Sequence, residues 1–170
     1  VNSSGVVATD VTGVGTARFG LQGAGYGGDK GIFAFGDTGG DTAVGMSNLV
    51  TNQGVIGADV SAVGTSKRGI GGAGYGTDKA IFGFGINASG ATALTNLVSS
   101  SGVVASDTAG VGTATAYHVA ATYGTDKAIF GFGTASGQVS TTNLVSNQGV
   151  VGSDVTGVGT GRAQAAATGY

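Results

Sequence analysis

The chain has 170 residues; 37 of them are glycine, and proline, cysteine, tryptophan and glutamate are absent. Seven basic and nine acidic residues give a formal charge of −2, which argues against nucleic acid or an anionic membrane as a partner. Without cysteine there is no disulfide framework or thiolate metal site, and no apolar run approaches the roughly 20 residues that span a bilayer, so no membrane insertion is expected.

The sequence is built from an internal repeat of 47 to 49 residues. A 26-residue stretch with the pattern V-x-x-x-G-V-[VI]-x-x-D-x-x-[GA]-V-G-T occurs four times; its copies begin at Val1, Val50, Val98 and Val145 and end at Tyr26, Tyr75, Tyr123 and Tyr170. The rest of the repeat occurs three times. We therefore divide this single array into a half unit at 1–26 and full units at 26–75, 75–123 and 123–170, about 3.5 copies in all.

Each unit is expected to contain four short strands. In the first copy these lie at about 18–26, at 32–35, through 48–50 and at 55–59. The second carries Ile-Phe-x-Phe, a run of β-branched and aromatic residues bounded by glycine. The Tyr-Gly-x-Asp-Lys segment before it has the residues of a tight hairpin turn. Four antiparallel strands in under 50 residues suit one blade of a β-propeller, so we predict an all-β repeat protein.

The stretches GRAQAAATGY and RFGLQGAGYGGDKGIFAFG resemble the kelch repeat of β-propellers, in which an arginine precedes a strand of small residues. Arg18 and Arg162 match that arginine, Lys67 substitutes for it, and Thr115 breaks the pattern. The chain also departs from the family in ending its aromatic strand with Phe-Gly and in lacking the family's tryptophan. The resemblance implies kelch-like, four-stranded blades. A β-solenoid and a β-trefoil are the alternatives.

The unit is also similar to glycine-rich repeats of phage and viral tail or fibre proteins. That resemblance implies a location on a virion or another extracellular surface. Three full units with incomplete ends would not close a ring, because propellers have roughly 4 to 8 blades. A homo-oligomer, or a longer array of the same repeats, is therefore the expected assembly.

One aspartate recurs in all four copies, three residues before Gly/Ala-Val-Gly-Thr. Calcium would need 6 to 8 oxygen ligands, and no copy has a second acid nearby, so we expect a structural residue that accepts hydrogen bonds from the following turn. A second recurrent aspartate precedes lysine in the predicted hairpin turn and is interpreted in the same way. The structural aspartates are Asp10, Asp59, Asp107, Asp154, Asp29, Asp78 and Asp126.

The residue types do not predict an enzyme. His118 is the only imidazole and occurs in one copy, where it is interpreted as a packed or surface variant. Adjacent Asp-Lys pairs on a strand would face opposite ways, and the Gly-x-Gly segments lack the helix that a phosphate loop needs. No cofactor and no metal are expected.

Function is therefore assigned to the surface. The variable segments 37–47, 86–95 and 134–142 are polar and carry the candidate ligand-binding residues Asp37, Asp41, Asn87, Ser89, Ser136 and Gln138, although none has an aromatic platform for a sugar ring. The sequence predicts a structural and adhesive module that binds glycan or protein weakly and multivalently. The alternative is a self-assembling fibre or ring component without a ligand.

Overall fold

The computed structural model describes residues 4–169, so Val1 and Tyr170, where the first copy begins and the last ends, lie outside it. Its regular elements are all strands. They are β1 (Gln22–Tyr26), β2 (Lys30–Ala34), β3 (Ser47–Val50), β4 (Gly71–Tyr75), β5 (Lys79–Gly83), β6 (Ile86–Asn87), β7 (Gly90–Ala91), β8 (Thr95–Val98), β9 (Val119–Tyr123), β10 (Lys127–Gly131) and β11 (Thr142–Val145). Within 4–169 no helix could cross a membrane.

These strands form three antiparallel sheets with the same order. The first sheet is β1-β2-β3, the second is β4-β5-β8 and the third is β9-β10-β11, while β6 and β7 form a separate hairpin. In each sheet a turn of three residues joins the first two strands, and Gly27 and Gly76 adopt positive φ there. The expected hairpin turns therefore join the strands expected on either side of them.

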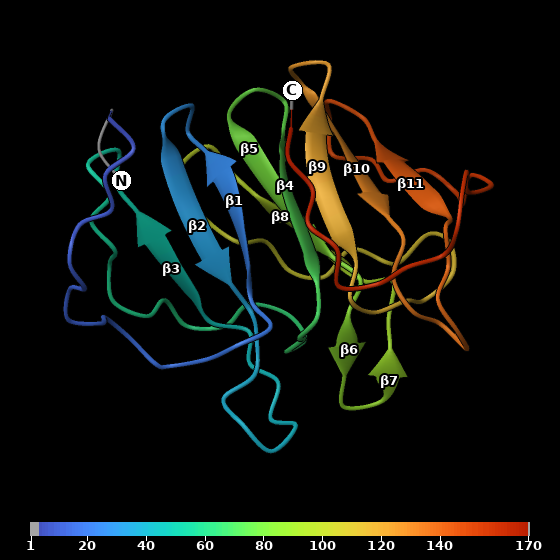
Figure 1. Cartoon of the computed structure of the whole chain (residues 1–170), viewed down its shortest axis with the longest axis horizontal. Coiled ribbons are helices and arrows are strands. Elements are labelled where there is room, and N and C mark those ends of the chain that lie inside the picture. The colour runs from blue at the N-terminus through green and yellow to red at the C-terminus, as the bar shows by residue number, and fades with distance from the viewer. Residues whose placement is uncertain (1–3, 170) are drawn as a thin grey trace.

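The sheets stand side by side, with β1, β4 and β9 on the inner side of the row (Figure 1). A ladder of backbone hydrogen bonds links the segments that lead into these strands. Gly69 N donates to Gly20 O at 3.0 Å, Tyr117 N to Gly69 O at 2.6 Å, and Gln164 N to Tyr117 O at 3.3 Å. The C-terminal segment thus lies against β9 in the way that each inner strand lies against its predecessor.

The core lies between successive sheets. Between the first and second sheets, Ile32, Phe35 and Phe82 are fully buried or nearly so, and between the second and third Phe84 and Phe130 occupy the corresponding space. The two aromatic pairs pack edge to face, with ring centroids 5.9 Å and 5.1 Å apart. Burial of these side chains is the main stabilising contribution to each interface.

Glycine inside the strands has a steric reason. A Cβ atom on Gly72 would lie 2.6 Å from the ring of Phe82, and one on Gly71 would lie 2.8 Å from the ring of Phe130. The ring of Phe82 rests on the glycine of its paired strand, and the ring of Phe130 rests on a glycine of the preceding sheet. A larger side chain would displace the first ring and push the sheets apart at the second.

Three details differ from the predicted strands. The inner strand begins at Gln22, since the chain bends at Gly20, where φ is 61°. The aromatic strand ends before its second phenylalanine, which is Phe35, Phe84 or Phe132 in the three sheets, because this residue has φ 62° and turns the chain. Phe35 and Phe84 nevertheless remain buried. The fourth strand is reduced to isolated bridges such as Ser47 with Val60 and Val50 with Ile56. We call 55–60, 103–108 and 150–155 the outer segments.

Candidate functional site

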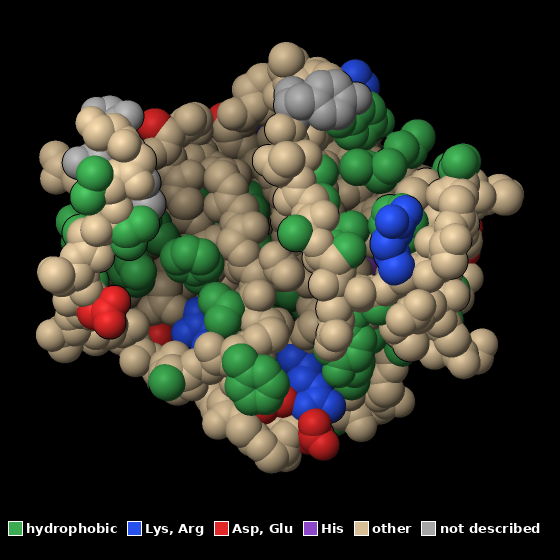
Figure 2. Space-filling model, viewed as in Figure 1, with side chains coloured by type: hydrophobic (Ala, Val, Ile, Leu, Met, Phe, Trp, Pro, Cys, Tyr) green, Lys and Arg blue, Asp and Glu red, His purple; other side chains and the backbone are tan. Residues whose placement is uncertain are grey.

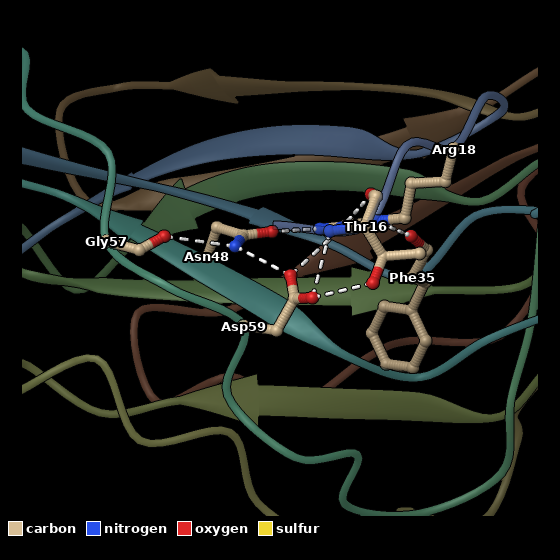
Figure 3. Close-up of polar contacts among 6 residues, drawn as sticks. All are labelled: Thr16, Arg18, Phe35, Asn48, Gly57 and Asp59. Atoms are coloured by element: carbon tan, nitrogen blue, oxygen red, sulfur yellow. Dashed lines mark hydrogen bonds and ion pairs between the residues drawn. The ribbon is translucent and has the colours of Figure 1, made fainter. Parts of the chain in front are cut away.

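The recurrent aspartate of each outer segment is held by a threonine from far earlier in the chain. Asp59 Oδ2 accepts hydrogen bonds from Thr16 N at 2.9 Å and Thr16 Oγ1 at 2.7 Å, while its Oδ1 accepts one from Asn48 Nδ2 at 2.9 Å (Figure 3). Asp107 and Asp154 make the same contacts; their threonine partners are Thr65 and Thr113, and their asparagine partners are Asn96 and Asn143. We call each of these three arrangements a Thr–Asp clasp.

The clasps show that the hydrogen bonds to the aspartate do not come from the turn that follows it, as was expected. The threonine precedes its aspartate by 43, 42 and 41 residues in the three clasps and does not belong to the following turn. The turn after Asp59 instead carries the next threonine, Thr65, which reaches forward to Asp107. For Asp10 the structure shows no side-chain hydrogen bond within residues 4–169.

Two clasps include a buried cation. Arg18 donates from Nη2 to Asn48 Oδ1 at 2.5 Å and from Nε to Phe35 O at 2.8 Å, and its Nη1 lies 3.6 Å from Asp59 Oδ1 (Figure 3). In the second sheet the fully buried Lys67 Nζ donates to Asn96 Oδ1 at 2.6 Å and to Leu94 O at 3.2 Å. The cation at the position of the kelch-like arginine therefore donates a hydrogen bond to the asparagine, and the asparagine donates one to the aspartate.

The third sheet replaces the cation with a neutral pair. Thr115 is too short to reach Asn143, and its hydroxyl instead contacts Nε2 of His118, whose ring stacks on Phe84 with a centroid distance of 4.2 Å. His118 is 3% exposed, and its Nδ1 is buried with no hydrogen-bond partner within residues 4–169. Burial lowers the pKa of His118 to about 4, against the opposing charge of Asp154, so the ring is neutral at pH 7.

The same environment shifts the other ionisable groups of the clasps. The hydrogen bond from Thr16, followed by that from Asn48, lowers the pKa of Asp59. For Asp107, desolvation acts upward, but the bonds from Thr65 and Asn96 outweigh it and the pKa is lowered. Desolvation lowers the pKa of Lys67 to about 8. These carboxylates are thus fixed as charged acceptors inside a structural network.

The aspartates of the hairpin turns have a different set of contacts. Asp29 Oδ2 accepts a hydrogen bond from Asn52 Nδ2 at 2.9 Å, and Asp126 Oδ2 accepts one from Asn147 Nδ2 at 3.1 Å. Asp78 lies 3.0 Å from Lys79 Nζ, and its backbone oxygen accepts a bond from Gly27 N of the preceding sheet. These residues therefore join the hairpin turns to the turns that follow β3 and β11, and to one another.

The three variable segments all lie at one end of the row, at the bottom of Figure 1, opposite the hairpin turns. They differ in structure as well as in sequence: 86–91 contains the β6–β7 hairpin, whose Asn87 Oδ1 accepts a bond from Ser89 N at 2.8 Å. Ser136 and Gln138 are exposed on the third segment. The predicted ligand residues thus lie at the same end of the molecule, although they do not converge on one point.

Asp37 and Asp41, two of the predicted ligand residues, are both paired with Arg68. Asp37 is fully buried, and its Oδ2 lies 2.5 Å from Nη1 of Arg68, which also pairs with the exposed Asp41. The bond to Arg68 is the largest cause that lowers the pKa of Asp37, despite burial, and Gly39 N adds a bond at 2.6 Å. This cluster anchors the first variable segment to the entrance of β4.

Beside this cluster is a groove of about 460 Å³, which we call the inner groove. Figure 2, which has the same view as Figure 1, shows basic and acidic side chains beside hydrophobic ones near the bottom of the molecule. The lining comes from corresponding positions of successive sheets and from the C-terminal segment: Phe19, Gly20, Gln22, Asp37, Asp41, Arg68, Gly69, Ile70, Tyr117, His118, Gln164 and Ala165.

Sequence reasoning named two of the lining residues, Asp37 and Asp41, but missed the groove itself, because it looked for a ligand site only in the variable segments. One signal was present in the repeat: the position occupied by Gly20 and Gly69 is Tyr117 in the third copy and Gln164 in the fourth. The structure supplies from these entrance segments the aromatic side chains that the variable segments lack, Phe19 at 62% and Tyr117 at 37% exposure.

Comparison with known proteins identifies a likeness of fold. No protein-family model matches the chain, and no curated protein sequence matches it. Among solved structures, that of YjhT superposes with a TM-score of 0.62 at 13% sequence identity. The match covers 80% of this chain but 44% of the YjhT chain, so this chain spans less than half the length of that protein. At this identity the likeness concerns the all-β fold alone.

Proposed function

We propose that the chain is a segment of a kelch-like β-propeller and serves as a non-catalytic binding module, on a virion appendage or another extracellular surface. Its ligand is a glycan or a protein, held through the end that carries the variable segments. Each sheet is one blade, the inner strand is nearest the propeller axis, and the outer segment is the reduced fourth strand.

One observation carries this proposal. Three sheets with the same strand order, the same clasps and the same inner ladder present three different loops at the same end (Figure 1). A rigid scaffold with variable loops at one end is the usual architecture of binding proteins, because loops can change without loss of the core. Several weak contacts on one rigid body also add up to useful avidity.

The chemistry of the recurrent residues supports a non-catalytic role. A general acid or base needs access to a substrate proton, whereas the carboxylates of Asp59, Asp107 and Asp154 are occupied by threonine and asparagine donors. His118 is buried against Phe84 and is neutral.

The test is binding of the intact chain to a printed array of oligosaccharides and purified cell-surface proteins. A variant in which 38–41, 87–90 and 135–138 are replaced by Gly-Ser of equal length should lose the array signal and keep the far-ultraviolet circular dichroism spectrum. The matched control changes exposed residues elsewhere, Gln53→Ser with Gln148→Ser, and should bind normally. Absence of any signal, or equal binding by the loop variant, would contradict the proposal.

A second candidate function is self-assembly, which the outer segments favour. They expose a row of valines that includes Val55 at 59%, Val103 at 64% and Val150 at 64%, and their pairing is limited to isolated bridges. Irregular outer edges with exposed apolar residues can pair with another chain. Light scattering over a range of concentrations tests this function: growing, polydisperse particles would favour it, and a species of fixed mass would not.

A further inference from the structure

We infer that the inner groove binds one neutral sugar residue, with Tyr117 and Phe19 against the apolar face of the ring and Arg68, Gln22 and Gln164 on its hydroxyl groups. This inference rests on the proposed binding function and gives it a location and a ligand class. It places the principal contact where the first variable segment, through Asp37 and Asp41, meets the entrances of the inner strands.

The groove arises where the repeat is broken. Gly20, Gly69, Tyr117 and Gln164 occupy the same position in successive copies and have nearly the same φ, from 55° to 61°. Glycine tolerates this left-handed conformation, whereas tyrosine and glutamine are strained in it. The two strained side chains are both in the groove lining. Strain that is retained at two neighbouring positions around one cavity points to a role for those side chains in binding.

Tyr117 is placed as a platform by the glycine before it in the ladder. A Cβ atom on Gly69 would lie 2.9 Å from the ring of Tyr117, so the ring packs directly on the backbone of the second sheet. The ring remains 37% exposed, and Phe19, 62% exposed, also lines the groove. Exposed aromatic rings in a cavity offer the flat apolar surface on which the C–H face of a sugar can pack.

The polar groups suit hydroxyls better than charged substituents. Arg68 Nη1 is paired with both Asp37 and Asp41, while its Nε and Nη2 have no acceptor within residues 4–169. One basic and two acidic side chains leave the lining with a net charge of −1, so an anionic ligand would meet no unpaired cation. Glutamine amides both donate and accept hydrogen bonds, as do hydroxyl groups. A carboxylated, sulfated or phosphorylated sugar is therefore disfavoured.

The size agrees with this ligand class. At about 460 Å³, the cavity lies in the range of roughly 300–1,000 Å³ that is typical for small-molecule sites. The site is also open to solvent, since Phe19, Gln22 and Gln164 are exposed, so a terminal or branching residue of a glycan can enter without unfolding the loops.

The experiment uses the intact chain and the methyl glycosides of glucose, galactose, mannose and N-acetylglucosamine, with sialic acid and glucose 6-sulfate as anionic probes. Saturation-transfer NMR identifies binding, and calorimetry gives its strength. The decisive variant is Tyr117→Gly, which installs the residue of the first two copies and removes backbone strain. It should fold at least as stably as the parent chain and lose at least tenfold in affinity for the neutral glycoside that binds best.

Phe33→Ala is the matched control, because Phe33 is an exposed aromatic residue outside the groove lining; it should bind like the parent chain. The inference fails if no neutral glycoside binds, if an anionic probe binds more tightly, or if Tyr117→Gly binds normally. A different result refutes the proposed function: the loop-exchanged variant keeps its array signal, or the parent chain has none. An array signal that depends on the loops but not on Tyr117 would leave only the broader proposal standing.

Discussion

Removal of one clasp carboxylate, in the variant Asp107→Ala, is expected to lower the free energy of unfolding substantially. Asp107 accepts bonds from Thr65 N at 2.9 Å, Thr65 Oγ1 at 2.7 Å and Asn96 Nδ2 at 2.9 Å. Its charge also favours the ammonium of the fully buried Lys67. The substitution therefore leaves a buried amide without one of its acceptors and removes the carboxylate whose charge favours the buried ammonium.

The expected loss is about 3 kcal/mol. Hydrogen bonds to a charged group contribute about 1.5–3 kcal/mol each. Because Asp107 is only half-buried, water replaces part of what Thr65 loses, and the contributions of one network do not add. Asp107→Asn should cost less, since an amide oxygen in the place of Oδ2 can still accept both bonds from Thr65, and only the bond from Asn96 is lost.

Urea denaturation followed by circular dichroism measures this loss. Asp10→Ala is the matched control, because Asp10 occupies the same repeat position without a clasp, and its midpoint should not move. The reasoning would be refuted if Asp107→Ala and Asp10→Ala shifted the midpoint equally, since the clasp would then contribute nothing to stability.

Two further predictions concern pH and packing. The pKa of His118 is about 4 in the folded chain and 6.5 when unperturbed, so the unfolded state binds more protons between these pH values. The free energy of unfolding should therefore fall by about 3 kcal/mol as pH drops from 6.5 to 4. In urea titrations, His118→Leu should remove this part of the pH dependence. An identical pH profile in the leucine variant would disprove the assignment. Gly72→Ala places a methyl group against Phe82 and should cost about 1–3 kcal/mol in thermal or urea unfolding, whereas Gly137→Ala, with open space around it, should be nearly neutral; equal effects would contradict the packing account.

The parts of the fold that the sequence predicted are those with a local signal. Ile32 and Phe33, with turn residues before them, locate the aromatic strand and its hairpin, because alternation and turn chemistry act over a few residues. The bend at Phe35 was missed, since a phenylalanine at positive φ is rare and is held there by long-range contacts, namely burial between two sheets and a hydrogen bond from Arg18 to its carbonyl oxygen.

The site shows the same division. A structural role for Asp59 could be inferred from its recurrence, but its donor Thr16 lies 43 residues away, beyond the reach of any turn rule. The groove was harder still to predict, because Phe19, Arg68 and Tyr117 come from three copies and meet only when the inner ladder is formed. Residues that break a repeat, such as Tyr117, are the useful signal in a chain of this kind.

The clasps also determine how the chain would respond to a pulling force. Thr16 lies where the chain enters the first sheet and Asp59 lies near the point where it leaves, so tension along the backbone is carried across the two bonds of this clasp before it reaches β1, β2 or β3. Thr65 follows Asp59 by six residues and begins the next such crossing at Asp107. A chain stretched between its ends would accordingly transmit tension from one clasp to the next. The buried aromatic residues between the sheets would bear no load until a clasp breaks.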